Sequence, residues 1–292
     1  MKKITLLNQI AKLLLVLVVC FTFSVVKAQN VLIIYDDSPA NVNTVSLSNA
    51  LTTAGFTVTY SAVSESSWNN ANPSLCAYEA VIHLNGTTYS QEMPAVGQLA
   101  LVDYVKYHNG LYIGFEWNAY QVGEGQYQSM LDLVLFDRQS GNESGPYPVT
   151  TIPAEAGHPV LAGVVSPFNL TAGINVGPLR TFSVEPSTAL MTINADPAVA
   201  IRDLGTGHVL GFNNAGNYDD YPALSNVELQ KLIVNFIGSY YTPVADLATL
   251  ADVTAECEVV SITAPTATDH CGAIITATTD AIFPITDQGT TV

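Results

Sequence analysis

Apolar residues occur in short runs in the first half of the chain, and the segments between these runs carry apolar residues at helical spacing. The runs predict buried strands at residues 31–35, 78–84 and 111–115, and residues 56–60 are expected to form a further strand. The helical spacing covers residues 42–54 and 93–108. Because strands and helices alternate, the pattern predicts an α/β fold with a doubly wound, mainly parallel sheet.

The second half of the chain has shorter strands and one long helix. Strands are expected at residues 189–193, 198–202 and 209–213, and a short helix at 130–136. Gly205-Thr206-Gly207 is typical of a hairpin turn between two of these strands. Residues 224–241 show an amphipathic pattern, with Ser225 as the candidate N-cap and Glu228 completing a capping box. Together, residues 29–241 are expected to form one domain.

Residues 1–28 carry the pattern of a signal peptide. Two lysines precede an apolar run, and Val26-Lys27-Ala28 supplies a small-residue cleavage site. A lipoprotein signal that uses Cys20 is the alternative, although Val19 stands where a small residue is expected. The apolar run falls short of the ~20 residues needed to span a bilayer. We therefore expect an exported chain without membrane insertion after the signal is removed.

The net charge of the chain excludes some classes of binding partner. The formal net charge is -16, and removal of the four lysines in residues 1–28 brings it to about -20. Such an acidic protein repels phosphate backbones and anionic headgroups, so nucleic acid and membrane surfaces are not expected as partners. Cations are compatible with this charge. The expected location is outside the cell or at the cell surface.

Short motifs accompany the predicted elements of the first domain. They are Asp36-Asp37 after the first strand, Asn85-Gly86 after the third, Gly110-Leu111-Tyr112-Ile113-Gly114, His158-Pro159-Val160-Leu161-Ala162-Gly163 and Gly205-Thr206-Gly207-His208-Val209. This series resembles the class I glutamine-amidotransferase-like fold and, within that superfamily, the trehalose-utilisation-type branch. The resemblance covers roughly residues 31–241 and implies a flavodoxin-like order of strands.

From residue 247 the sequence becomes rich in threonine and valine, with period-two alternation. Cys257 followed by Asp269-His270-Cys271-Gly272 resembles the opening of a hyalin-repeat module, an immunoglobulin-like sandwich of exported bacterial surface proteins. Such a sandwich needs ~80–100 residues, and residues 242–292 supply about half of them. We expect an incomplete all-β immunoglobulin-like module, followed by further C-terminal modules of the same chain.

Three cysteines remain once residues 1–28 are removed. Cys257 and Cys271 close a short loop, and we expect them to form a disulfide in an oxidising compartment, which would contribute about 3 kcal/mol. Cys76 is left over. We expect it to be a buried small hydrophobe, with a reactive or intermolecular thiol as the alternative.

The turn after residues 111–114 shows whether the chain has the nucleophile of an amidotransferase. Amidotransferases of the class I superfamily carry a cysteine nucleophile there, whereas this chain has Gly114-Phe115-Glu116-Trp117. Phe115 has neither a thiol nor a hydroxyl, so residue identity excludes the amidotransferase mechanism. The sequence leaves open whether any other catalysis remains, and the absence of a nucleophile favours a protein that is not an enzyme.

Polar residues at the predicted strand ends are the candidate site. Glu116 could act as a general base, hold a cation or bind a sugar beside Trp117, and it could equally cap the following helix. Asp36 and Asp37 would lie at the same edge, where with Glu116 they could hold a hard cation such as calcium; a turn and helix cap is the alternative. The remaining candidates on neighbouring loops are Asn85, Gly86, Asn214 and Asp219.

The sequence does not predict other cofactors. No Gly-x-Gly-x-x-Gly follows the first strand, and the five histidines show no zinc-ligand spacing.

Two functions therefore compete. The preferred one is an exported, non-catalytic surface or adhesion protein whose α/β domain binds a glycan, a cation or a surface protein at its strand-edge loops. The alternative is a secreted carbohydrate-active hydrolase that uses Glu116 with Asp36 or Asp37 as acid and base.

Overall fold

The computed structural model describes most of the α/β domain and short pieces beyond it. The described residues are 29–139, 143–171, 173–174, 177–218, 222–241, 261–264, 266–268, 274–276 and 283–284. The predicted signal peptide, with Cys20, lies outside them. Within these ranges, no helix has the length and apolar character needed to cross a membrane.

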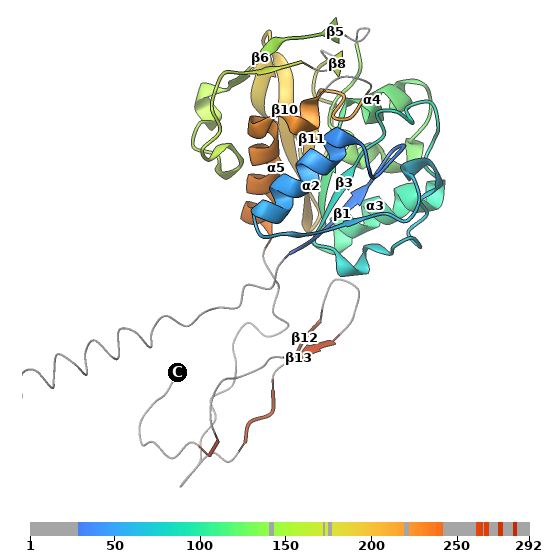
Figure 1. Ribbon diagram of the computed structural model, residues 1–292, viewed down its shortest axis with the longest axis vertical. Coiled ribbons are helices and arrows are strands. Elements are labelled where there is room, and N and C mark those ends of the chain that lie inside the picture. The colour runs from blue at the N-terminus through green and yellow to red at the C-terminus, as the bar shows by residue number, and fades with distance from the viewer. Residues whose placement is uncertain are drawn as a thin grey trace, which may run out of the picture.

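Nine strands form one sheet in the order β2-β1-β3-β4-β11-β10-β9-β6-β7 (Figure 1). They are β1 (Asn30–Ile34), β2 (Thr57–Tyr60), β3 (Ala80–His83), β4 (Leu111–Gly114), β6 (Tyr147–Thr151), β7 (Phe168–Leu170), β9 (Thr188–Ile193), β10 (Asp196–Leu204) and β11 (Gly207–Phe212). From β2 to β11 neighbouring strands run parallel, and from β11 to β7 they run antiparallel.

This topology confirms the predicted α/β architecture, because β1, β3 and β4 are neighbours in one sheet. The sheet as a whole is mixed rather than mainly parallel, since the second half of the chain extends it from β11 with antiparallel strands. The predicted hairpin is confirmed as well. β10 and β11 pair up to Leu204 and Gly207, and Gly205 lies in the turn with a φ of 60°.

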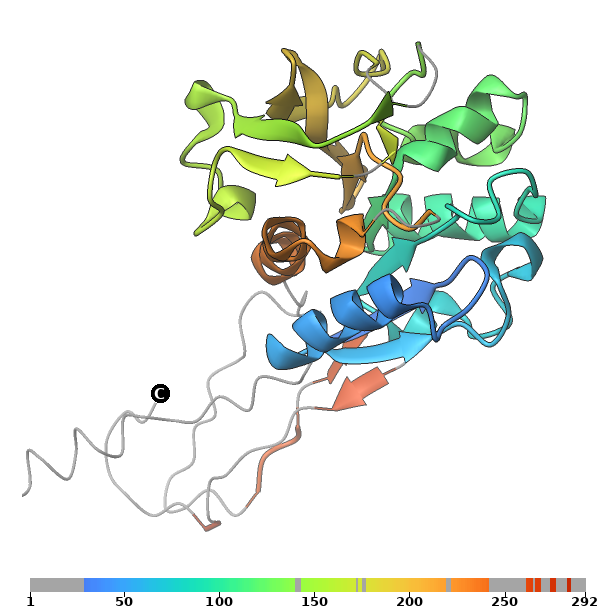
Figure 2. The same ribbon diagram turned by 45° about the horizontal axis from the view of Figure 1, so that its top comes forward.

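Helices cover both faces of the parallel half of the sheet (Figure 2). α2 (Val42–Thr53) and α5 (Val227–Tyr240) pack on one face, and α3 (Ala95–Tyr107) packs on the other. α4 (Glu116–Gly123) starts where β4 ends. The shorter elements are the 3-10 helices η1 (Glu65–Ser67), η2 (Leu75–Ala77), η3 (Gln128–Leu133), η4 (Pro153–Glu155), η5 (Pro159–Leu161) and η6 (Ala223–Ser225), and the strand pair β5 (Glu143–Ser144) and β8 (Gly173–Ile174).

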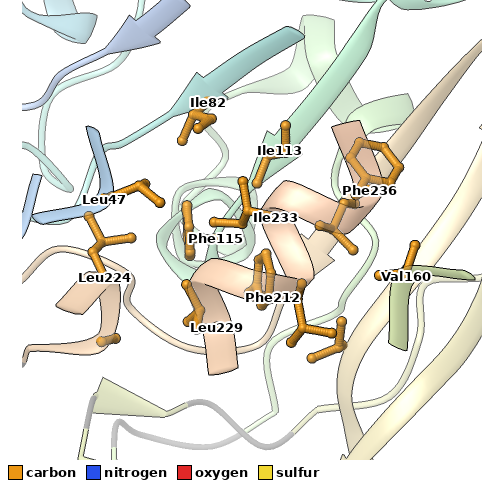
Figure 3. Packing of buried hydrophobic residues seen from close by; sticks show 14 of the residues in the cluster. Leu47, Ile82, Ile113, Phe115, Val160, Phe212, Leu224, Leu229, Ile233 and Phe236 are labelled. Carbon is orange, nitrogen blue, oxygen red and sulfur yellow. The ribbon is translucent and has the colours of Figure 1, made fainter. Parts of the chain in front are cut away.

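The sheet separates two hydrophobic cores. Successive residues of a strand point to opposite faces, so Ile33 joins the core under α2 and α5 while Leu32 joins the core under α3. In the first core, Phe115 and Phe212 pack beneath α5 beside Ile113 (Figure 3). This burial of both faces explains why the strands read as continuous apolar runs.

Two predictions about helices are corrected by the structure. Asn226, and not Ser225, caps α5, because its side chain accepts hydrogen bonds from the backbone N–H groups of Glu228 and Leu229. Ser225 lies in η6 and donates to Asn43 instead. Residues 128–133 form a 3-10 helix with a kink at Met130, where a regular helix was expected.

The chain beyond residue 241 is described only in short pieces. β12 (Thr266–Thr268) and β13 (Ile274–Thr276) form an antiparallel pair. The remainder of the predicted immunoglobulin-like module, including Cys257 and Cys271, lies outside the described residues.

The expectation that Cys76 is a buried small hydrophobe is wrong. Cys76 is exposed and disulfide-bonded. It lies in η2, where Leu75 and Tyr78 are the residues that turn inward, so the position between them faces solvent.

The first core offers a direct stability test on α5. Phe236 is fully buried, so Phe236→Ala should lower the free energy of unfolding by about 3–5 kcal/mol. Val227 on the same helix is 61% exposed, and Val227→Ala should change it by less than about 0.5 kcal/mol. Urea denaturation compares the two variants, and equal losses would contradict the described packing.

Candidate functional site

Four adjacent parallel strands end at one edge of the sheet and lead into polar residues. Asp36 follows β1, Asn85 follows β3, Glu116 follows β4 and Asn213 with Asn214 follows β11. Because β1, β3, β4 and β11 are consecutive in the sheet, these residues meet at its carboxyl edge. This edge is where ligands bind in open α/β sheets.

Asp36 joins two loops at this edge. Its side chain is fully buried, and Oδ2 accepts hydrogen bonds from the backbone N–H of Thr87 (2.9 Å) and from the Thr87 hydroxyl (2.7 Å). Oδ1 accepts from the side-chain amide of Asn217 (2.9 Å). Burial raises the pKa of Asp36 above its usual value of 3.8, although the bonds from Thr87 oppose the shift. Both oxygens are therefore engaged within the protein.

Asp37 has a different setting. It is exposed, whereas Asp36 and Glu116 are buried. The predicted helix cap at Asp37 is wrong, because Asn41 caps α2 by accepting from the backbone N–H groups of Asn43 and Thr44.

The loops after β3 and β11 touch through their backbones. A Cβ atom at Gly86 would lie 1.2 Å from the carbonyl oxygen of Asn217, so only glycine permits this approach. Beside it, the Asn85 amide donates to Gln121 Oε1 on α4 (2.7 Å). The candidates Asn85 and Gly86 are therefore packed against the neighbouring loop and helix.

The turn after β4 buries Phe115 and starts α4 with Glu116. The ring of Phe115 stacks on Phe212 in the core, with ring centroids 5.2 Å apart. The backbone N–H of Glu116 donates to Asn214 (2.9 Å), and its carboxylate lies 3.8 Å from Nε of Arg138. Glu116 is the first residue of α4 and Phe115 is its N-cap, so Glu116 does not cap the helix, although the helix dipole favours a carboxylate in the first turn.

Four aromatic side chains gather at this edge and are called here the aromatic cluster. They are Tyr89, Trp117, Tyr120 and Tyr218. Tyr89 stacks on Trp117 at 4.6 Å between ring centroids, and Tyr218 lies 4.8 Å from Trp117. The guanidinium of Arg138 lies 4.3 Å from the ring centroid of Tyr120. Trp117 is buried, while the three tyrosines are half-buried.

Sequence reasoning found Trp117 and missed the rest of the aromatic cluster and Arg138. The cluster draws on the loop after β3, on α4 and on the loop after β11. No spacing in the sequence predicts that these segments meet. The only available signal was that each tyrosine follows a predicted strand end by a few residues.

Several buried polar atoms around the aromatic cluster have no hydrogen-bond partner within the protein. They are Asn85 Oδ1, Thr88 Oγ1, Trp117 Nε1 and Asn217 Oδ1. Unpartnered buried polar atoms are uncommon in native proteins and often mark places where water or a ligand binds. Asn214 differs, because its side chain accepts from the backbone N–H of Gly216 (3.0 Å). Asp219 lies outside the described residues.

The described part of the chain contains no group of three His, Cys, Asp or Glu side chains arranged to hold a metal ion. Since the Asp36 oxygens already accept three hydrogen bonds, this carboxylate is poorly placed to serve as a ligand for calcium.

Comparison with known proteins places the fold. No protein-family model and no curated protein matches the sequence. A solved ThuA-like protein from Bacteroides uniformis ATCC 8492 is similar in structure, with 16% identity and a TM-score of 0.52 over 74% of this chain and 95% of that one. A cytoplasmic protein from Salmonella typhimurium LT2 gives 15% identity and a TM-score of 0.52, over 73% of this chain and 100% of that one. The chain therefore shares the α/β fold of these proteins, and at this identity the likeness extends to the fold alone.

The buried position of Asp36 predicts a pH dependence. A raised pKa means that the folded state holds the proton more tightly, so stability should fall as pH rises from about 4 through the folded pKa. Asp36→Asn cannot ionise and should lack this loss. Unfolding free energies of both proteins between roughly pH 4 and 7 measure the difference, and a wild-type protein that gains stability relative to Asp36→Asn over this range would contradict the assignment.

Proposed function

We propose that the carboxyl edge of the sheet binds a glycan and that the protein does not turn it over. The aromatic cluster carries this proposal. Sugar rings expose C–H faces that pack on aromatic rings, and aromatic side chains beside a few placed polar groups form sites that fix such a ligand. Tyr89, Tyr120 and Tyr218 offer half-buried side chains at one edge, and Glu116 with Arg138 supplies polar groups beside them.

The polar atoms at the edge favour a neutral glycan over an acidic one. Asn85 Oδ1 and Asn217 Oδ1 can only accept hydrogen bonds, and the Thr88 hydroxyl can also accept. A sulfated or uronic-acid glycan would bring further acceptors and negative charge to a protein of formal net charge -16.

The hydrolase alternative is less well supported by the described geometry. Two carboxylates must flank a glycosidic bond at ~5–9.5 Å. Asp36 accepts hydrogen bonds on both oxygens, Asp37 faces solvent, and Glu116 is buried beside Arg138. Phe115 occupies the nucleophile turn with its ring in the core, so this position supplies neither a thiol nor a hydroxyl.

The cellular setting is part of the same proposal. The pattern of residues 1–28, the acidic composition and the resemblance of residues 242–292 to a hyalin-repeat module together support an exported surface or adhesion protein. In that setting, a module of this kind would act as a stalk for the α/β domain. Calcium as a cofactor is an outcome that the glycan array distinguishes, and a surface protein as the partner in place of a glycan would leave the array without binding.

Tyr89 is the first residue to test. Tyr89→Ala should weaken binding to arrayed neutral glycans by about tenfold or more, because it removes the ring stacked on Trp117. Tyr107 is an exposed tyrosine on α3, and Tyr107→Ala is the matched control with unchanged binding. The array is read with and without calcium. Binding confined to sulfated or uronic-acid glycans, or equal losses in both variants, would contradict the proposed site.

A second test separates binding from catalysis. The wild-type protein should release no reducing ends from any glycan that it binds on the array. Turnover by the wild type that disappears in Glu116→Gln would establish the hydrolase alternative and overturn the non-catalytic part of the proposal.

A further inference from the structure

A buried polar cluster lies behind the aromatic cluster, on the face of the sheet that α3 covers. We call Glu65, His83, Tyr112, Asn118 and Tyr127 the relay cluster. They come from η1, β3, β4, α4 and the segment before η3, and each is at most 2% exposed. Five polar side chains so deeply buried need mutual hydrogen bonds, because each unpartnered group would lower stability.

The hydrogen bonds form one continuous chain. The Asn118 amide donates to the Tyr112 hydroxyl (2.9 Å), which lies 2.8 Å from Nδ1 of His83. On its other side, Nε2 of His83 lies 3.5 Å from Oε2 of Glu65. The Tyr127 hydroxyl donates to the same Glu65 oxygen (2.8 Å) and also lies 3.5 Å from Nε2. The chain therefore connects η1 to the first turn of α4.

The positions of the protons fix which group donates and which accepts along this chain of hydrogen bonds. Burial raises the pKa of Tyr112 and Tyr127 well above 10, so both hydroxyls keep their protons. Since Tyr112 already accepts from Asn118, the acceptor for its own proton is Nδ1 of His83. His83 then carries its proton on Nε2 and directs it toward the Tyr127 hydroxyl, which itself donates to Glu65. Any other tautomer leaves the Tyr112 proton without an acceptor.

The absence of a side chain at Gly114 leaves room for this chain of hydrogen bonds. A Cβ atom at Gly114 would lie 2.7 Å from Nδ2 of Asn118 and 2.8 Å from the ring of Tyr112. Both contacts are shorter than real side chains make, so a larger residue would displace one end of the Asn118–Tyr112 hydrogen bond. The strand end thus leaves room for a bond that anchors α4.

We infer that Tyr112 and His83 are positioning residues, which hold Asn118 and thereby fix the first turn of α4 that carries Glu116 and Trp117. The role assigned to them rests on the glycan-binding function proposed above. Trp117 is the ring against which Tyr89 and Tyr218 pack, so a displacement of this turn would disturb the whole aromatic cluster.

A pair of tyrosine variants of the full chain tests this role. Tyr112→Phe should weaken binding to arrayed neutral glycans by about tenfold, because Asn118 and His83 both lose a buried partner. It should also increase quenching of Trp117 fluorescence by acrylamide, a probe that needs no glycan. Trp68, the other tryptophan, is fully buried and gives a common background.

Tyr104→Phe is the matched control. The Tyr104 hydroxyl is equally buried and donates to the carbonyl of Tyr78 (3.1 Å), away from the relay cluster. Its loss should lower stability and leave both glycan binding and Trp117 quenching unchanged. If the two variants have equal effects on binding and quenching, Tyr112 has only a structural role, and its assignment as a positioning residue is overturned.

The wild-type protein provides a readout that requires no variant. Nitrogen-15 NMR of labelled histidine should show His83 with Nε2 protonated and Nδ1 unprotonated at neutral pH. Protonation of Nδ1 would overturn the relay. If no glycan binds at all, the glycan function fails, while the NMR spectrum and the quenching data still decide whether the relay positions α4.

Discussion

One buried carboxylate holds the loops at the carboxyl edge of the sheet together. Asp36 follows the first strand and accepts hydrogen bonds from Thr87 and Asn217, which belong to loops far apart in the sequence. A charged group without partners at such a depth would be strongly destabilising, so the two loops must stay in contact with it. Gly86 then allows the backbones of the two loops to touch.

The aromatic cluster depends on this arrangement. Tyr89 lies three residues after Gly86, and Tyr218 directly follows Asn217, so the loops joined by Asp36 bring these rings to Trp117 from two sides. From behind, the relay cluster fixes the helix that carries Trp117. A rigid scaffold with two sets of hydrogen bonds thus presents the half-buried aromatic cluster, which is the arrangement that keeps the entropy loss on binding small.

The sequence predicted the parts of this fold that depend on local pattern. Apolar runs located β1, β3 and β4, and Gly205-Thr206-Gly207 located the hairpin. The site was predicted only in part, because Asp36 and Glu116 follow strands whereas Tyr89 and Arg138 reach the edge through tertiary contacts. The relay cluster was missed for the same reason. His83 looks like a core histidine until Glu65, on a different segment, is placed beside it.

The exposure of Cys76 and the N-cap of α5 were also predicted wrongly from the sequence. Cys76 was expected to be buried from its apolar neighbours, yet a 3-10 turn rotates it outward. Ser225 and Asn226 are both good caps, and only the exact start of α5 decides between them.

The most direct measurement is a crystal structure of the protein with a neutral glycan that it retains on the array. We expect a sugar ring packed against the aromatic cluster, with its hydroxyls bonded to polar atoms of the loops after β3 and β11. A glycan bound over the antiparallel strands β9, β10 and β6, with the carboxyl edge of the parallel strands empty, would contradict it.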